Sequence, residues 1–168
     1  MTDASWTWDA VRYRPIGVIH TSFREPAGTP IQATSFVGSA GHVEIEPALA
    51  PGLRDLEAFS HLILLYHLHR VGVVKLTVTP FLDDRPHGIF ATRSPARPNP
   101  IGLSTVRLVA IEGSTLEVED VDMVDGTPLL DIKPYVPAFD ERDDVRVGWF
   151  TERLSGLPGA RADDRFRA

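Results

Sequence analysis

Short apolar stretches separated by turn-forming residues run through most of the chain. Several of them alternate or cluster β-branched and apolar residues over strand-like lengths, which predicts strands at residues 16–20, 42–46, 75–79, 104–111, 115–121 and 129–132. A longer apolar stretch at residues 60–67 shows no alternation and predicts a strand buried on both faces. Glu112-Gly113-Ser114 and Asp125-Gly126 are typical turn sequences between successive strands.

Helical periodicity is confined to two short segments. Residues 51–59 begin with a proline and place Leu53 and Leu56 near one side, and residues 147–154 are the second candidate. With 13 glycines and 14 prolines in 168 residues, turns should be frequent and long helices few. The pattern predicts a mainly β fold, a small closed β-barrel of short strands with one or two short helices.

The chain length favours one domain with a sizeable core. We expect residues 1–12 to be an N-terminal extension, residues 13–152 to form the barrel, and residues 153–168 to be a basic tail with both ends of the chain loosely held. The acidic and polar N-terminus does not resemble a signal peptide, and the longest apolar run is too short to span a bilayer. We therefore expect a cytoplasmic protein with no membrane contact.

The composition narrows the chemistry that the chain can perform. It contains no cysteine, which excludes disulfides, thiolate nucleophiles and cysteine-ligated metals. The phosphate-binding patterns GxGxxG and GxxxxGK[ST] and the serine-hydrolase pattern GxSxG are also absent, so a doubly wound nucleotide-binding fold is disfavoured. His67 and His69 alternate as metal ligands can, but no carboxylate partner lies at ligand spacing, and we expect no metal site.

Charge is unevenly distributed along the chain. The formal net charge of −6 counts against nucleic-acid binding, yet Arg85, His87, Arg93 and Arg97 lie close together in the sequence. A local basic surface is therefore compatible with the acidic total.

Residues 88–104, GIFATRSPARPNPIGLS, combine two arginines, an asparagine and three prolines between apolar segments. Each proline fixes φ and biases the residue before it towards extended conformations, so the loop is stiff and its donors are pre-organised. Arg93 and Arg97 offer planar donors, and Asn99 offers a donor and an acceptor. From composition alone, a ligand site and a rigid surface crossover are comparable interpretations.

Three motifs together resemble a known family. The strings LEAFSHLILLYHLHR, FATRSPARPNPIGLS and VDMVDGTPLLDIKPY occur in this order and look like the signature of the TsaA-like (TrmO) family of S-adenosylmethionine-dependent tRNA methyltransferases. The resemblance covers residues 13–137. It implies a small β-barrel methyltransferase, distinct from the Rossmann type, that works as a homodimer with cofactor sites at the subunit interface.

The resemblance also assigns residues to S-adenosylmethionine. Ile31 stands where the family commonly has a basic residue, and Arg70 replaces a more usual glutamine. Physically, Arg93 suits the carboxylate of the cofactor, Leu103 its adenine, and an aspartate its hydroxyl or ammonium groups. The cofactor positions implied are Pro30, Ile31, Gln32, His69, Arg70, Arg93, Leu103, Asp122, Met123, Val124 and Asp125.

In the family the methyl acceptor is the exocyclic nitrogen of threonylcarbamoyladenosine beside the tRNA anticodon. We expect Arg97 and Asn99 to contact this substrate, and the sequence identifies no catalytic base. Bacterial members often carry a further C-terminal domain, whereas this chain ends soon after KPYVP, which resembles a short form. Three alternatives stay open: a module that binds S-adenosylmethionine or RNA without catalysis, a methyltransferase for another small acceptor, and a hydrolase acting on the cofactor.

Overall fold

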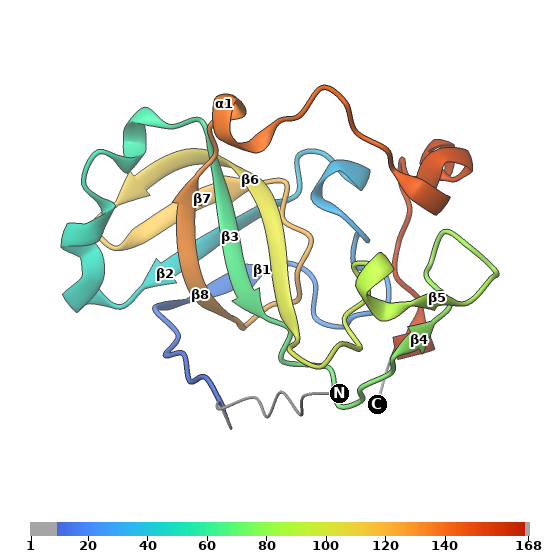
Figure 1. Cartoon of the computed structure of the whole chain (residues 1–168). Coiled ribbons are helices and arrows are strands. Elements are labelled where there is room, and N and C mark those ends of the chain that lie inside the picture. Colours follow the sequence, from blue (N-terminus) through green and yellow to red (C-terminus); the bar gives the residue numbers. More distant parts are fainter. Residues whose placement is uncertain (1–9, 167–168) are drawn as a thin grey trace, which may run out of the picture.

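Six antiparallel strands close into a barrel in the computed structural model, which describes residues 10–166 (Figure 1). Neighbouring strands follow the order β1-β2-β7-β6-β3-β8, and β8 pairs with β1 to close the barrel. The predicted closed barrel is therefore confirmed. The barrel strands are β1 (Gly17–Thr21), β2 (Ala40–Ile45), β3 (His61–His67), β6 (Ile101–Glu112), β7 (Thr115–Glu119) and β8 (Thr127–Pro134).

Alternation of side chains along the strands builds the core. In an extended strand successive side chains point to opposite faces, so every second residue enters the barrel. Each fully buried aliphatic side chain contributes about 1.5–3 kcal/mol by leaving water. The fully buried interior residues include Ile19, Val43, Leu62, Leu64, Val106, Leu116, Val118 and Leu129.

Strand β3 differs from the prediction of burial on both faces. Leu62, Leu64 and Tyr66 are buried, whereas Ile63 and Leu65 on the other face are only partly buried. The barrel wall is one sheet thick, so its outer face meets solvent and crossing loops rather than a second layer. Its inward residues belong to the core, and Ile63 and Leu65 are partly covered on the outer face.

The predicted helices are 3-10 turns rather than α-helices. Residues 51–59 fall in η2 (Pro47–Leu53) and η3 (Leu56–Ala58), and Pro51 inside η2 cannot donate the backbone bond that an α-helix needs. Residues 147–154 similarly fall in two 3-10 turns. The other short elements are η1 (Ala33–Ser35), η4 (Ile89–Ala91), α1 (Pro137–Asp140), η5 (Gly148–Glu152), η6 (Leu154–Gly156) and η7 (Asp164–Phe166).

The predicted strand at residues 75–79 is reduced to a two-residue strand outside the barrel. Only β4 (Thr77–Val78) is extended, and it pairs with β5 (His87–Gly88) in a separate small sheet. This sheet lies beside the barrel in Figure 1, near the C-terminal segment. Within residues 10–166, no helix has the length and apolarity that crossing a bilayer requires.

Residues 153–166 of the C-terminal segment pack against the fold, whereas we expected the segment to be loosely held. Gly28 N–H donates to Ala162 O and Ala162 N–H to Thr29 O, both at 2.8 Å. Phe166 is buried in a second apolar cluster with Val78, Ile89 and Ala96. Of the basic residues in this segment, Arg161 lies over the Phe36 ring and Arg165 pairs with Asp163. Arg167, and the extension up to residue 9, lie outside the described residues.

Gly102 lets the ring of Tyr66 cross the barrel interior, and this contact can be tested. A Cβ at Gly102 would lie 2.1 Å from Cε2 of the buried Tyr66 ring. We therefore expect Gly102→Ala to lower the free energy of unfolding by about 1–3 kcal/mol, the usual cost of overpacking. Gly52→Ala is the control, because a Cβ there meets nothing within 4 Å. Chemical denaturation that shows equal stability for both variants would contradict the packing described.

Candidate cofactor site at the loop end of the barrel

Three chain connections meet at one end of the barrel. Because neighbouring strands are antiparallel, the ends of β1, β3 and β7 lie beside the starts of β2, β6 and β8. The connections between these strands, residues 22–39, 68–100 and 120–126, therefore gather at this end. Segments far apart in the sequence are brought together by strand pairing alone.

The three connections enclose a cavity of about 990 Å³. This volume is within the range of small-molecule sites in proteins. Every residue that the sequence predicted for the cofactor or the substrate lines this cavity, except Asp125. The lining includes Pro30, Ile31, Gln32, His69, Arg70, Arg93, Arg97, Asn99, Leu103, Asp122, Met123 and Val124.

A hydrogen bond links two of the connections across the cavity. The Arg93 guanidinium donates from Nη1 to Oε1 of Gln32 over 2.7 Å. Gln32 is held in turn, since its Nε2 donates to Ile31 O and its backbone carbonyl accepts from Ser35 Oγ. Arg93 is thus presented as an oriented donor with remaining N–H groups for an anionic ligand.

A buried chain of hydroxyl and carboxyl groups leads into the cavity from the core. Ser104 Oγ donates to Asp122 Oδ1 over 2.5 Å and lies 2.9 Å from the Tyr66 hydroxyl. Because the serine proton is directed at Asp122, Tyr66 donates to Ser104. Burial raises the pKa of Tyr66 well above its usual value, which keeps this donor protonated.

Asp122 is the acid at the end of this chain. Burial raises its pKa to about 6, although the Ser104 hydroxyl, the Ala33 amide and the Arg93 guanidinium favour the ionised form. The carboxyl group is consequently mostly ionised at neutral pH but easily protonated below it. An acid with this environment in a cavity is typical of a functional group rather than of a surface carboxylate.

His69 supplies an imidazole that is neutral at pH 7. Burial, together with the neighbouring Arg70 and His67, lowers its pKa from the ordinary value of 6.5. Thr127 Oγ1 donates to Val124 O over 2.6 Å and lies 3.4 Å from His69 Nδ1. The imidazole is therefore anchored to the β7–β8 connection through Nδ1.

Two residues of the stiff loop 88–104 differ in how they are held. The Arg97 Nη1 donates to Thr92 O and Ser94 O over 3.2 and 3.3 Å, so this half-buried side chain shapes the loop itself. Asn99 is exposed at the cavity rim. Ser94, by contrast, has a buried Oγ without a hydrogen-bond partner among the described residues.

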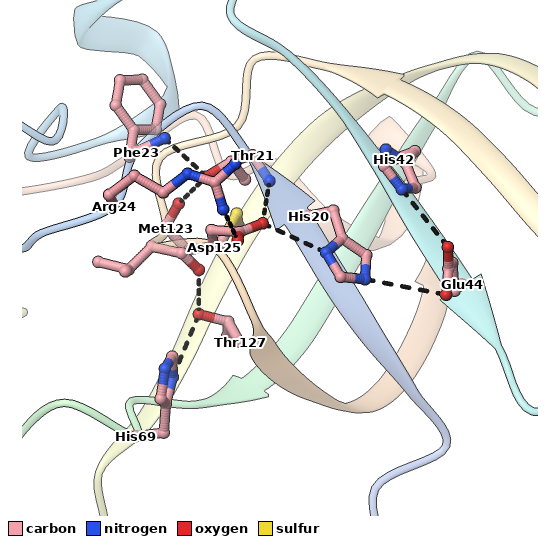
Figure 2. A network of polar contacts seen from close by, with 11 residues as sticks. His20, Thr21, Phe23, Arg24, His42, Glu44, His69, Met123, Asp125 and Thr127 are labelled. Carbon is pink, nitrogen blue, oxygen red and sulfur yellow. Dashed lines mark hydrogen bonds and ion pairs between the residues drawn. The ribbon is translucent and has the colours of Figure 1, made fainter.

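Asp125 points away from this cavity. Figure 2 shows its carboxylate between Arg24 and His20 on the outer side of the β7–β8 connection. One oxygen accepts from the Thr21 amide over 3.1 Å and lies 3.2 Å from His20 Nδ1, and the other contacts Arg24. Burial opposes ionisation, but the Thr21 amide, His20 and Arg24 together lower the pKa of Asp125. Its partners are therefore within the protein, not in the cavity.

Residues 147–166 complete the lining of the cavity, a role that the sequence did not predict. Trp149 donates from Nε1 to Ala91 O over 2.8 Å and stacks on His87. The segment contributes Val147, Trp149, Phe150, Leu154, Leu157 and Phe166 to the lining. Aromatic residues spaced along an irregular segment carry no periodic signal. The apolar residues Trp149 and Phe150, followed by Leu154, were the only feature of the sequence that could have indicated this role.

The sequence profile of the tRNA-methyltransferase O N-terminal domain matches residues 18–141. The chain belongs to this family. The match includes the three connections and every predicted contact residue. The family assignment made from the three motifs is therefore confirmed.

Proteins of the tRNA-methyltransferase O family are similar over most of this chain. A probable S-adenosyl-L-methionine-binding protein of Pyrococcus abyssi is 54% identical over 92% of this chain and 84% of its own. The human tRNA (adenine(37)-N6)-methyltransferase is 35% identical over 78% of this chain and 31% of its own. The crystal structure of TrmO from Pseudomonas aeruginosa matches 83% of this chain and 62% of its own with a TM-score of 0.70 and 37% identity. The chain thus spans less than two thirds of the human and Pseudomonas proteins.

The raised pKa of Asp122 predicts a specific pH dependence of stability. Between about pH 4 and pH 6 the native state keeps a proton that the unfolded chain releases, so the free energy of unfolding falls as pH rises. Asp122→Asn removes this contribution, which amounts to at most about 3 kcal/mol. We expect wild-type stability relative to Asp122→Asn to decrease from pH 4 to pH 6 and then level off. Denaturant titrations that give a pH-independent difference would contradict the burial of this acid.

Proposed function

We propose that the protein is an S-adenosylmethionine-dependent methyltransferase that methylates N6 of threonylcarbamoyladenosine next to the anticodon of tRNA. The observation that carries the proposal is the convergence of the family's contact positions from three separate connections on one cavity. The names of the mammalian relatives, tRNA (adenine(37)-N6)-methyltransferases, support the reaction, and those of the archaeal relatives support the cofactor. The proposed domain for this activity is the barrel with its packed C-terminal segment.

The residues present fit S-adenosylmethionine. The remaining donors of Arg93 suit the polar amino-acid end of the cofactor, and the Asp122 carboxylate suits its hydroxyl or ammonium groups. Leu103, with Ile31 and Met123, offers apolar surface for the adenine. We propose further contacts from Pro30, Gln32, His69, Arg70 and Val124, which line the same cavity, and none from Asp125 within one subunit.

Bound S-adenosylmethionine supplies a methyl group activated by a positively charged sulfonium. Transfer from it is an in-line displacement, which depends on alignment and exclusion of water more than on a strong base. The aromatic and aliphatic walls of the cavity reduce contact with water, and the stiff loop 88–104 fixes Arg93 and Leu103. Keeping His69 uncharged avoids repulsion of a cationic ligand, while the Asp122 carboxylate attracts it.

A homodimer would complete the site. Apolar side chains at the rim of the cavity are exposed in one subunit, with Phe90 at 77%, Leu103 at 47% and Ile101 at 43% of their full exposure. Exposed apolar residues next to a cavity are typical of a surface that a partner covers. We propose that a second copy of this chain covers them, and that both subunits together present Arg97 and Asn99 to tRNA in the cytoplasm.

Arg93→Ala tests the cofactor site. Loss of a charge-assisted hydrogen bond should weaken S-adenosylmethionine binding by roughly 1.5–3 kcal/mol, measured by calorimetry. Arg107→Ala is the matched control, because Arg107 pairs with Glu119 on the outer face of the barrel. Equal affinity of Arg93→Ala and the control would remove Arg93 from the site. A wild type without measurable affinity would reject the cofactor altogether.

Methyl transfer itself is tested with the full chain, S-adenosylmethionine and tRNA that carries threonylcarbamoyladenosine. Mass spectrometry of the digested nucleosides should show a gain of one methyl group on that nucleoside, and tRNA lacking the threonylcarbamoyl group should gain none. The names of the archaeal relatives favour one alternative, a module that binds the cofactor without transferring its methyl group. Cofactor binding without methylated product would support this alternative.

A further inference from the structure

A second cluster of chemically active side chains lies outside the cavity, on strands β1 and β2. His20 and His42 are directly opposite each other in the antiparallel pair, and Glu44 follows two residues along β2 on the same face. The two imidazole rings stack with their centroids 4.8 Å apart. Strand pairing therefore places three potential metal ligands on one patch of the barrel surface.

The ligand atoms of these residues converge. Figure 2 shows the Glu44 carboxylate beside the two rings and joined to both; its oxygens lie 3.8 Å from His20 Nε2 and 3.6 Å from His42 Nε2. All three ligand atoms lie within 4.8 Å of one another. Ligands bound tetrahedrally to zinc at 2.0–2.2 Å are roughly 3.3 Å apart. Ligation therefore requires the His42 ring to turn out of the stack and Glu44 to move with it, and both side chains are exposed enough to do so.

Asp125 holds the His20 ring in an orientation that suits metal binding. Its Oδ1 already accepts from the Thr21 amide and its other oxygen contacts Arg24, so the carboxylate acts as an acceptor and His20 Nδ1 is the donor. In the neutral ring Nε2 then carries the lone pair, and Nε2 is the nitrogen that faces Glu44. A carboxylate that accepts from the second nitrogen of a ligating histidine is the usual support of protein metal sites.

From this geometry we propose that His20, His42 and Glu44 bind a divalent transition-metal ion, with Asp125 as a positioning residue. Two imidazoles and one carboxylate favour zinc or a neighbouring ion such as cobalt or nickel over calcium or magnesium, which prefer oxygen ligands. Three protein ligands leave a fourth position open. The same hollow is lined by Glu117, which lies opposite His42 on β7.

The proposed metal site does not depend on methyl transfer, but it lies next to the wall of the cofactor cavity. Asp125 directly follows Asp122, Met123 and Val124, which line the cavity from the other side of the same connection. Metal binding at His20 would therefore hold the β7–β8 connection in place through Asp125. The sequence predicted no metal site because the two histidines are on separate strands and no short motif contains both.

Zinc titration of the full chain tests the site. The chain is purified without a polyhistidine tag, treated with a chelator and titrated with zinc chloride in a calorimeter. We expect one zinc ion per chain, and at least tenfold weaker binding for His42→Ala and for Glu44→Gln. His67→Ala is the control, because it removes an exposed imidazole at the end of β3 and should leave zinc affinity unchanged.

Two further measurements separate ligation from a general effect on the fold. Asp125→Asn should weaken zinc binding by 10–100-fold, as expected for a residue that orients a ligand. In the wild type, zinc should shift the imidazole NMR signals of His20 and His42 and leave those of His67 in place. No zinc binding, unchanged affinity in both ligand variants, or shifts at His67 instead would overturn the proposal.

Discussion

Closure of the barrel between β8 and β1 is the constraint on which both proposed sites depend. The backbone pairing from Gly17 to Ile19 with Leu129 to Thr127 fixes the start of β8, and thereby the connection that precedes it. One side of that connection faces the cavity with Asp122 and Met123, and the other side faces His20 with Asp125. The short β7–β8 connection thus contributes side chains both to the cavity and to the surface around His20.

The interior of the barrel is not uniformly apolar, and its polar part leads to the cavity. Gly102 leaves space for the Tyr66 ring, the ring reaches Ser104, and Ser104 donates to Asp122. The raised pKa of Asp122 means that an ionised carboxylate at this place is less stable than in water. Such a cost to stability is typical of a group retained for binding, because a positively charged ligand in the cavity would relieve it.

The sequence was most informative where periodicity or a motif was strong. The apolar and β-branched pattern predicted the strands that form β6 and β7, and the motifs predicted the residues that three connections bring to one cavity. It was misleading where tertiary contacts override local pattern. Pro51 and the short apolar segments around residues 147–157 form 3-10 turns, and β3 has one buried face rather than two. The approach of His20 to His42 depends on strand register, which no local motif encodes.

The central claim is that the cavity at the loop end of the barrel holds S-adenosylmethionine. Amide NMR of the full chain during titration with S-adenosylmethionine tests it most directly, because each affected residue is located separately. We expect the largest shifts at Gln32, Arg93 and Asp122, which lie on the three connections. Shifts confined to the opposite end of the barrel, around the Gly113 turn between β6 and β7, would contradict it.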